Sequence, residues 1–596
     1  MGTTQQFRRP ANLCEKRFVA ATLLILALAG LMVSPAWAMS IIGVAPSGGS
    51  VLLAPPDPCL PAPQILNFTV TPTTVAFGQS VTLSWNVQVP SGCNYLVAIL
   101  GRSMPLQGSV QDQPIFDTSY TLTLSWGPTR SLYAIATTPA VSVTVPKDPS
   151  DPTGMRNLIT ISSQQMVPMF VRALSTPNTT VIVNADLDLS GLPNTYYSSR
   201  ILIGDGVRLV GGRTAVPGQP FRAGPLLFTT DNPAENLFEV VGNNVRVTGV
   251  RIQGPDMGVS DNTMSTGLLI SDINPNNIVL PAGHISVEID HSEFAGWSHA
   301  GVRVVDYVYK ITVQSWVDYA STPAEVVYAQ STEPVYIHDN FIHHNQHSNG
   351  NGYGVAVAAG AHAFIDRNVF DWNRHAISQE DGSSRTGYRA YRNLVLQNGG
   401  LDQWLYGFGW AHTHLFDMHG QNTCNFIDHY CGTAGHDYDI RYNSFLYTAG
   451  AAVKLRGTPE PFGLPYSTVV RFNVFAHANP DDAVQHTEGA PVVQDNLMGR
   501  TAYYGLQTCD FDGDGIKDLF IATEQTLWYC PAPSDCVTAT GSGKASWVYL
   551  NSSTKRTDQL SLGYFSGGRV CDVADGGLIS VGGSGPWRQT LFYRAQ

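Results

Sequence analysis

Two short phrases of alternating character place ionisable side chains of opposite charge where they can meet. In LFDMHG the apolar residues turn to one side of an extended chain, which turns Asp417 and His419 to the other. In AVKLRG the same alternation turns Lys454 and Arg456 away from the apolar side. If the two phrases are neighbouring strands, about 5 Å apart, an acid and a histidine face two cations. Groups this close perturb each other's pKa, which is a frequent property of proton-transfer sites.

More ionisable residues surround this pair of phrases, and thirteen of the 16 histidines lie between positions 338 and 486. DWNRHAI places Arg374 and His375 at the end of a turn, from which they can reach the same face. A polar outer face without chemistry is an equally weighted alternative. The other candidates for catalysis and substrate binding are Asp371, His343, His344, His412 and His414.

The spacing His412-x-His414-x-x-Asp417-x-His419 also has the ligand types of a transition-metal site. A His-x-His pair on one strand face can bind zinc, but the strand alternation puts Asp417 out of phase with that pair. A charge cluster is therefore favoured over a metal site.

A second motif, CDFDGDGIKDLF, has the spacing of a calcium loop. Carboxylates at Asp510, Asp512, Asp514 and Asp518 alternate around a glycine that permits a sharp bend, and Ca²⁺ takes six to eight oxygen ligands. A later copy, GYFSGGRVCDVAD, retains only the last carboxylate, so a single Ca²⁺ is expected as cofactor. A structural staple is a simpler role for this ion than regulation or substrate bridging.

The elements that must position these groups are indicated by a repeated asparagine. Each repeat has β-branched or aromatic residues alternating around the asparagine, as in a short strand that ends in a turn. Repeats of this size cannot bury their apolar faces alone and must stack, which would align the asparagines in a ladder. The spacing doubles once, which indicates either a long loop or a skipped coil. The repeats are VYIHDNFI, AFIDRNVF, YRAYRNLVL, DIRYNSFL, VVRFNVFA and VVQDNLMG, with Asn340, Asn368, Asn393, Asn443, Asn473 and Asn496.

These phrases, with GVRLVGG and NNVRVTGVRI before them, resemble the right-handed parallel β-helix of the pectate-lyase-like superfamily over residues 148–505. The resemblance implies an all-β fold with a long shallow groove for an extracellular polysaccharide. The segments at 305–332 and 395–436 interrupt the repeat and are expected to be loops.

The flanking segments have their own signatures. Residues 1–38 contain a basic start, an apolar run and Ala36-Trp37-Ala38, which predicts a signal peptide, and 39–62 is a linker rich in Pro, Gly and Ser. Residues 63–147 resemble a bacterial Ig-like β-sandwich with Trp85 in its core, and 506–596 resemble an FG-GAP or VCBS repeat module. A secreted or periplasmic protein is expected. No stretch after residue 38 reaches the ~20 apolar residues of a membrane span.

Charge and cysteines agree with export. Signal removal takes away four cations and one anion, so the net charge goes from -12 to -15, which disfavours a nucleic-acid partner. An even number of cysteines in an exported chain favours disulfides. The expected pairs are Cys59 with Cys93, Cys424 with Cys431, Cys530 with Cys536 and Cys509 with Cys571.

Three functions fit these observations. A polysaccharide lyase would use Lys454 or Arg456 as base, the other cation to neutralise a uronate, and His375 or His419 as acid. An inverting hydrolase would need two carboxylates, such as Asp371 and Asp417, about 6.5–9.5 Å apart. A non-catalytic adhesin or glycan-binding protein is the third. The lyase is slightly preferred because cations accompany the acid.

Overall fold

The structure is a computed structural model of the 596-residue chain. It describes residues 62–76, 79–91, 93, 95–99, 102–112, 114, 118–126, 133–145, 158–194, 199–214, 218–233, 235–260, 263–271, 286–305, 335–348, 350–358, 361–380, 386–400, 403–404, 410–411, 413–418, 437–455, 467–486, 491–500, 507–531, 547–564, 569–575 and 591–593. The predicted signal peptide, the loop at 305–332 beyond Val305 and much of 395–436 lie outside these residues.

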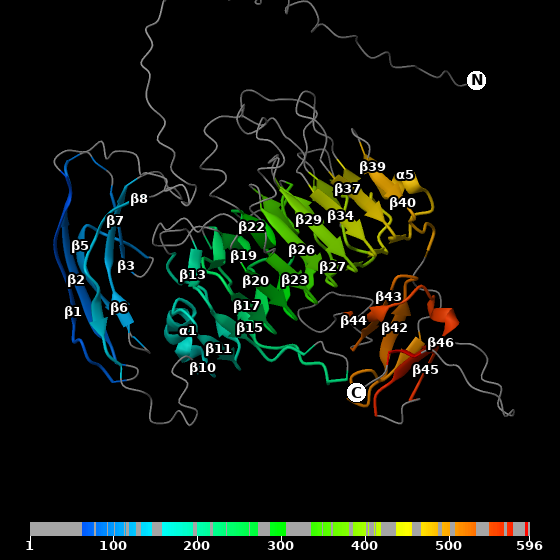
Figure 1. The fold of residues 1–596 in the computed structure, drawn as a ribbon, viewed down its shortest axis with the longest axis horizontal. Coiled ribbons are helices and arrows are strands. Elements are labelled where there is room, and N and C mark those ends of the chain that lie inside the picture. The colour runs from blue at the N-terminus through cyan, green and yellow to red at the C-terminus, as the bar shows by residue number, and fades with distance from the viewer. Residues whose placement is uncertain are drawn as a thin grey trace, which may run out of the picture. The chain divides into compact units, whose positions relative to one another are not determined.

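Three parallel sheets dominate the described part of the chain, with 11, 9 and 9 strands, and successive strands along the sequence enter the three sheets in turn (Figure 1). This is the all-β parallel β-helix that the repeat predicts.

Sheet 1 contains β10 (Leu158–Ile161), β11 (Thr180–Val183), β14 (Arg208–Val210), β17 (Val245–Thr248), β20 (Val287–Asp290), β23 (Val335–His338), β26 (His362–Asp366), β29 (Gly387–Tyr391), β34 (Asp437–Arg441), β37 (Ser467–Arg471) and β40 (Val492–Gln494). Sheet 2 contains β12 (Leu187–Asp188), β15 (Leu226–Phe228), β18 (Arg251–Gln253), β21 (Glu293–Ala295), β24 (Phe341–His343), β27 (Val369–Asp371), β30 (Leu394–Val395), β35 (Ser444–Phe445) and β38 (Val474–Phe475). Sheet 3 contains β13 (Ser199–Ile203), β16 (Asn236–Val240), β19 (Thr266–Ser271), β22 (Ala300–Val305), β25 (Tyr353–Ala358), β28 (His375–Gln379), β33 (Phe416–Met418), β36 (Val453–Leu455) and β39 (Val484–His486).

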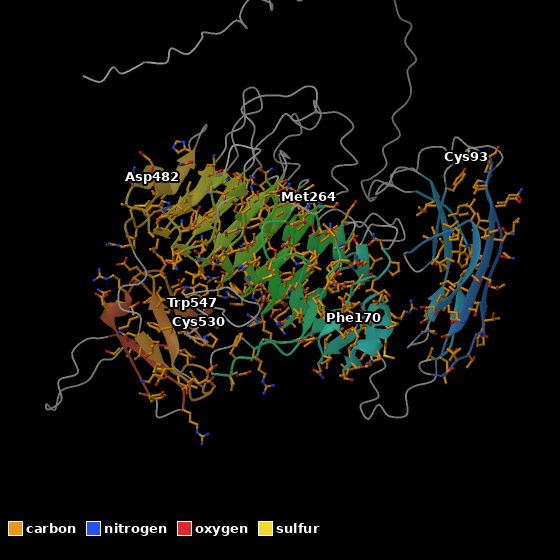
Figure 2. The ribbon with its side chains drawn as sticks, turned by 180° about the vertical axis from the view of Figure 1, so that it is seen from behind. Cys93, Phe170, Met264, Asp482, Cys530 and Trp547 are labelled. Atoms are coloured by element: carbon orange, nitrogen blue, oxygen red, sulfur yellow. A yellow bond between two sulfur atoms is a disulfide. The ribbon has the colours of Figure 1, made fainter. Side chains whose placement is uncertain are left out.

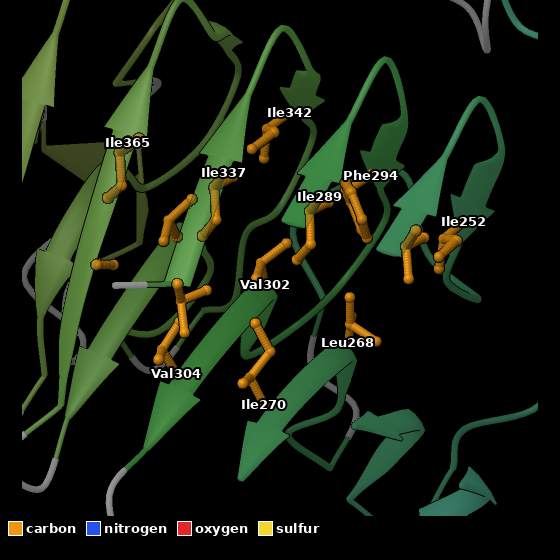
Figure 3. Packing of buried hydrophobic residues seen from close by; sticks show 14 of the residues in the cluster. Ile252, Leu268, Ile270, Ile289, Phe294, Val302, Val304, Ile337, Ile342 and Ile365 are labelled. Carbon is orange, nitrogen blue, oxygen red and sulfur yellow. The ribbon is translucent and has the colours of Figure 1, made fainter. Parts of the chain in front are cut away.

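The core of the β-helix is built from equivalent aliphatic residues of successive coils. Ile289, Ile337 and Ile365 are in register on β20, β23 and β26 and are fully buried. Figure 3 shows them facing Val302 and Val304 of sheet 3. Because side chains alternate along a strand, each inward aliphatic residue leaves its neighbours on the outer face.

The predicted asparagine ladder is confirmed. Asn368 donates from Nδ2 to the Asn393 side-chain oxygen (3.2 Å) and to the Ile337 carbonyl (2.8 Å), and its own oxygen accepts from the Asn340 backbone N–H (3.1 Å). The same contacts continue from Asn443 through Asn473 to Asn496. The residue before each asparagine is in the left-handed conformation, for example Arg367 at φ 51°. The ladder thus fixes a turn that most side chains disfavour.

The doubled spacing is one enlarged coil and not a skipped coil, and the segment at 395–436 is not a loop throughout, because Val395 ends β30 and Phe416–Met418 form β33 of sheet 3. The Asn393 backbone N–H donates directly to the Asn443 side chain (2.9 Å), and β29 pairs with β34. Asn393 and Asn443, 50 positions apart, therefore stand in successive coils.

Asn368→Ala is expected to lower the free energy of unfolding by roughly 1–3 kcal/mol, because it leaves buried backbone and amide groups without partners. Denaturant unfolding of the full chain measures this change. The exposed Asn194→Ala is the control and should stay within ~0.5 kcal/mol of the wild type. Equal stability of Asn368→Ala and the wild type would show that the ladder does not hold the turns.

Short helices occur at both ends of the β-helix. The helix η1 (Gln164–Met166) leads into α1 (Val167–Leu174), whose Phe170 packs edge-on against Phe238 of β16 at 6.4 Å. The helix α5 (Pro480–Ala483) is capped at its N-terminus by Asn479, whose side chain accepts from the Asp481 backbone N–H. The apolar face of α1 therefore contributes to the core of the first coils.

Residues 62–145 form antiparallel sheets around a core of their own that includes Trp85. Their strands are β1 (Gln64–Thr71), β2 (Val81–Gln88), β3 (Leu96–Ile99), β4 (Arg102–Met104), β5 (Gln107–Asp112), β6 (Thr118–Tyr120), β7 (Leu122–Trp126), β8 (Tyr133–Thr137) and β9 (Val141–Val143). The ribbon β31 (Gln403–Trp404) and β32 (Trp410–Ala411) is a separate pair.

The described residues from 507 onward, here called the C-terminal module, are antiparallel. They contain β41 (Gln507–Cys509), β42 (Asp518–Ala522), β43 (Thr526–Cys530), β44 (Val548–Ser552), η2 (Thr557–Gln559), β45 (Leu560–Gly563), β46 (Asp572–Asp575) and β47 (Leu591–Tyr593). Trp547 and Cys530 of this module belong to a buried apolar cluster with Phe341, Val369 and Leu394 of sheet 2 (Figure 2). The module thus covers part of the outer face of sheet 2.

The disulfide predicted between Cys509 and Cys571 is confirmed, with sulfur atoms 2.00 Å apart. Cys93 and Cys530 each take part in a disulfide bond as well. Their predicted partners Cys59 and Cys536, and the predicted pair Cys424 and Cys431, lie outside the described residues. No helix within the described ranges is long and apolar enough to cross a membrane.

Candidate functional site

The outer face of sheet 3 brings the two charged phrases together as predicted. Strands β33 and β36 are parallel neighbours, and Asp417 is in register with Lys454. Lys454 is half-buried, but Asp417 is fully buried at 0% exposure. The outward phase that the strand alternation gives Asp417 thus does not expose it to solvent, and burying a carboxylate makes its surroundings part of the folded structure.

Four rings follow one another from coil to coil, each at or just before the start of a strand of sheet 3 (β22, β25, β28 and β33). His299 and Tyr353 lie with ring centroids 6.1 Å apart, Tyr353 and His375 stack at 5.7 Å, and His375 and His414 lie 4.1 Å apart. Arg374 lies over the Tyr353 ring and donates to its hydroxyl (3.3 Å). We call His299, Tyr353, His375 and His414 the ring row.

Asp417 lies at one end of the ring row. Its Oδ1 is 3.0 Å from His414 Nε2, and its Oδ2 is 3.8 Å from His375 Nε2. His375 Nδ1 is 2.6 Å from the His414 carbonyl oxygen. A carbonyl only accepts, so Nδ1 carries the proton and Nε2 is left with a lone pair. Because the Nδ1 proton of His375 is held by the His414 carbonyl oxygen, His375 cannot be the acid that the lyase hypothesis assigns to it.

Glu380 lies at the other end of the ring row and was not found from the sequence. It accepts from Arg303 Nε (2.7 Å) and forms a short bond with His299 Nε2. These partners come from a strand two coils away, and the small side chains of Ala356 and Ala358 on the intervening strand leave room for them. The Glu380 side chain is 16% exposed. Its partners lie 77 and 81 residues away, so only the register reveals them.

Burial and charge set the protonation of this face. Burial would raise the pKa of Glu380, but Arg303 and His299 outweigh it and hold that pKa well below the usual range. Burial, together with the Arg374 and His414 charges, lowers the pKa of His375 well below its usual value. Burial raises the pKa of Tyr353 to about 12, against the opposing charge of Arg374. At neutral pH the face therefore carries an ionised Glu380, a neutral His375 and a protonated Tyr353.

Three predicted residues belong to a different face. His343 on β24 and Asp371 on β27 are neighbours in register on sheet 2, and His344 stacks on Trp372 at 5.4 Å. Trp372 is in the left-handed conformation at φ 52°, and this corner separates β27 from β28. The expectation that Asp371, His343 and His344 share a face with Asp417 is therefore wrong, and Asp371 and Asp417 cannot form a catalytic pair.

The sheet 2 group is a buried charge network. Glu293 Oε2 is 3.2 Å from Arg213 Nη1, and Glu293 Oε1 is 3.2 Å from His343 Nε2. All three side chains are at most 3% exposed. Burial raises the pKa of the nearby Asp371 to about 8. Since these four ionisable side chains are shielded from solvent, this network is better suited to stability than to binding a substrate.

A second asparagine pair at this corner was also missed. Asn345 donates to Asn373 (2.8 Å), and Asn373 donates to the Ile342 carbonyl (2.9 Å). Each stands five positions after a member of the main ladder, Asn340 or Asn368, and this repeated spacing was visible in the sequence. Of the remaining predicted residues, His412, His419 and Arg456 lie outside the described residues.

The acidic loop of the C-terminal module gathers as predicted. Oxygens of Asp510, Asp512 and Asp514 lie within 4.8 Å of one another, an arrangement that can hold a hard cation. Asp518 is close by, and burial with the neighbouring carboxylates raises its pKa to about 7. Asp512 also accepts from the Phe221 backbone N–H of the β-helix (2.9 Å). The loop therefore touches both parts of the chain.

Comparisons with known proteins add little to this geometry. No family model matches the sequence, and no curated protein matches it. Among solved structures, the chain is similar to the crystal structure of Dettilon tailspike protein (gp208), with 12% identity, a TM-score of 0.21, and coverage of 71% of this chain and 82% of that chain. A score this low carries no argument, so the fold assignment rests on the parallel sheets themselves.

Proposed function

We propose that the protein binds an extracellular polysaccharide along the outer face of sheet 3 and cleaves it by β-elimination. The observation that carries this proposal is the register of Lys454 with Asp417 beside the ring row. Secretion, proposed from residues 1–38, would place the protein with such a substrate.

The repeating geometry suits a polymer. Successive coils present equivalent positions about 4.8 Å apart, so a chain-like substrate can lie across several coils. His299 and His414, the partly exposed members of the ring row, offer flat ring surfaces against which sugars pack. Arg374 supplies a cation beside Tyr353. These are contacts for an acidic, extended sugar chain.

The reaction can be assigned to residues of this face. Deprotonated Lys454 takes the proton from the carbon next to a uronate carboxylate, and Arg374 offsets the charge of that carboxylate. The electron pair forms a carbon–carbon double bond as the bond to the glycosidic oxygen breaks. Tyr353 retains its proton at neutral pH and is the donor to the leaving oxygen, in place of His375.

Hydrolysis by inversion is the second candidate, and one observation favours it. Asp417 is in register with Ser378, and Glu380 lies two residues further along the same face. A strand spacing of about 4.8 Å and a rise of about 3.3 Å per residue put the two backbone positions roughly 8 Å apart, and inverting enzymes separate their carboxylates by about 6.5–9.5 Å. The Glu380 side chain turns away from Asp417 toward Arg303 and His299, so substrate binding would have to release it from them.

Assays of the mature chain on a panel of uronate-containing and neutral polysaccharides test the proposal. β-Elimination yields new reducing ends together with ultraviolet absorbance of unsaturated uronates. Reducing ends without that absorbance would establish the hydrolase instead. Binding without any cleavage across the panel would show a glycan-binding protein, and neither binding nor cleavage would reject the proposal.

We further propose that Ca²⁺ binds Asp510, Asp512 and Asp514 and staples the C-terminal module. Chelation is then expected to lower the melting temperature of this module, since saturation at 100 times Kd stabilises by ~2.7 kcal/mol. Differential scanning calorimetry measures the shift, and Asp512→Ala should abolish it. Asp558→Ala, an exposed acid of the same module, is the control. A calcium response unchanged in Asp512→Ala would place the ion elsewhere.

A further inference from the structure

Two histidines of the ring row, His375 and His414, converge with Asp417 on one point. His375 opens β28, and His414 and Asp417 flank the start of β33, the next strand of sheet 3. Because Ile377 pairs with Phe416, the two histidines are equivalent residues of adjacent coils. One atom each from His375, His414 and Asp417 lies within 4.8 Å of the other two.

The tautomer of His375 leaves one nitrogen of its ring as a possible metal ligand. Its Nδ1 donates to the His414 carbonyl oxygen, so its Nε2 presents a lone pair. That Nε2 is buried, has no hydrogen-bond partner among the residues that the structure describes, and faces Asp417 Oδ2 at 3.8 Å. A lone pair and a carboxylate oxygen repel each other unless a positive centre lies between them.

We infer that His375 Nε2, His414 Nε2 and Asp417 form a binding site for a divalent transition-metal cation, with zinc as the foremost candidate. Zinc binds imidazole nitrogen at about 2.0–2.1 Å and carboxylate oxygen at about 2.0–2.2 Å, so tetrahedral ligand atoms stand roughly 3.4 Å apart. Asp417 Oδ1 lies 3.0 Å from His414 Nε2, and Asp417 Oδ2 lies 3.8 Å from His375 Nε2, so the two separations bracket that value.

The surroundings of the three ligands fit such a site. Metal-binding histidines commonly donate their second ring nitrogen to a carbonyl, as His375 does. Thr413 Oγ1 donates to the Arg374 carbonyl (2.5 Å), and the buried Tyr388 hydroxyl donates to the Asp417 carbonyl (3.3 Å). These bonds hold both coils in register. Two imidazoles select borderline metals over Ca²⁺ and Mg²⁺, which prefer oxygen alone.

Three protein ligands leave room for a further ligand on a tetrahedral cation, as in catalytic zinc sites. Lys454 lies one coil away, in register with Asp417. A cation here would also attract the uronate carboxylate of a substrate, and this one consequence rests on the proposed function. Binding of the metal itself does not.

Titration of the chelator-treated full chain with zinc, in millimolar calcium to saturate the acidic loop, tests the site by calorimetry. We expect one zinc per chain in the wild type and a loss of affinity of at least ~100-fold in His414→Ala and Asp417→Asn, since even outer-shell changes cost 10–100-fold. His486→Gln, an exposed histidine of β39, is the control and should bind as the wild type does.

A second measurement needs no variant. X-ray absorption of the zinc-loaded wild type should show scattering from two imidazoles, and cobalt should give the visible bands of four-coordinate nitrogen and oxygen ligation. Absence of a one-to-one zinc site, fewer than two imidazoles, or a folded Asp417→Asn that binds zinc like the wild type would overturn the inference. Zinc binding without polysaccharide cleavage would leave the site intact and reject only the proposed function.

Discussion

Lys454→Ala is expected to lower the rate of polysaccharide cleavage by about 10²–10⁴-fold, the usual cost of losing a general base. Its melting temperature should stay close to that of the wild type, because Lys454 is half-buried on an outer face. Initial rates on the substrate found by the panel, with thermal unfolding of the same preparation, measure both quantities.

Two further variants separate the role of a base from that of a charge. Lys454→Arg keeps the cation but not an amine that can deprotonate near neutral pH, so kcat should fall while KM changes little. Gln485→Ala alters the next, exposed residue of the same register and should leave the rate unchanged. Full activity in Lys454→Ala would move the base elsewhere on the sheet, and its unfolding would make the residue structural.

Glu293→Gln is expected to destabilise the β-helix by about 3–5 kcal/mol, because removing one member of a buried ion pair leaves its partner's charge uncompensated. Here the partner is Arg213, whose guanidinium shares the site with His343. Chemical denaturation of the variant and wild type measures the difference. Glu288→Gln, which removes a half-exposed acid beside Arg246, is the matched control and should change stability by less than ~1 kcal/mol.

The same carboxylate should make stability depend on pH in acid. Burial would raise the pKa of Glu293, yet the His343 bond and the Arg213 charge hold it below the ordinary value of 4.5. A depressed pKa in the folded state contributes stability that is present above the unfolded pKa and is lost as pH falls through the folded pKa. Below about pH 4.5 the wild type should therefore lose this contribution, and Glu293→Gln should show a flatter profile. Identical acid profiles would show that Glu293 is not ionised in the fold.

The repeat carried enough information to predict the β-helix and the partner strands of its candidate site. Each asparagine marks the same corner of its coil, so the position of any residue along the coil could be counted from it. The pairing of Asp417 with Lys454 followed from that count. The second corner was misjudged. Trp372 adopts a left-handed turn that residues other than glycine seldom take, and it moves Asp371 to another sheet than His375.

Contacts between side chains two coils apart could not be predicted from the sequence, because they depend on the size of the residues on the strand between them. Glu380 meets Arg303 only because two alanines on the strand between them are small, and neither phrase has a local signature. Burial of Asp417 likewise depends on how the chain covers the outer face, whereas strand alternation distinguishes only inward from outward.

The single coil that joins Asn393 to Asn443 is twice as long as its predecessor, yet the ladder passes through it with the same 2.9 Å hydrogen bond. Doubling a loop costs only about 0.6 kcal/mol of closure entropy, which one rung of the ladder can offset. The length of a connection between two strands therefore has little effect on the stability of the asparagine ladder. In evolutionary terms, such a protein can change what it binds by lengthening the connections of one coil, after β30 and after β33, while the stacking of the coils is inherited unchanged.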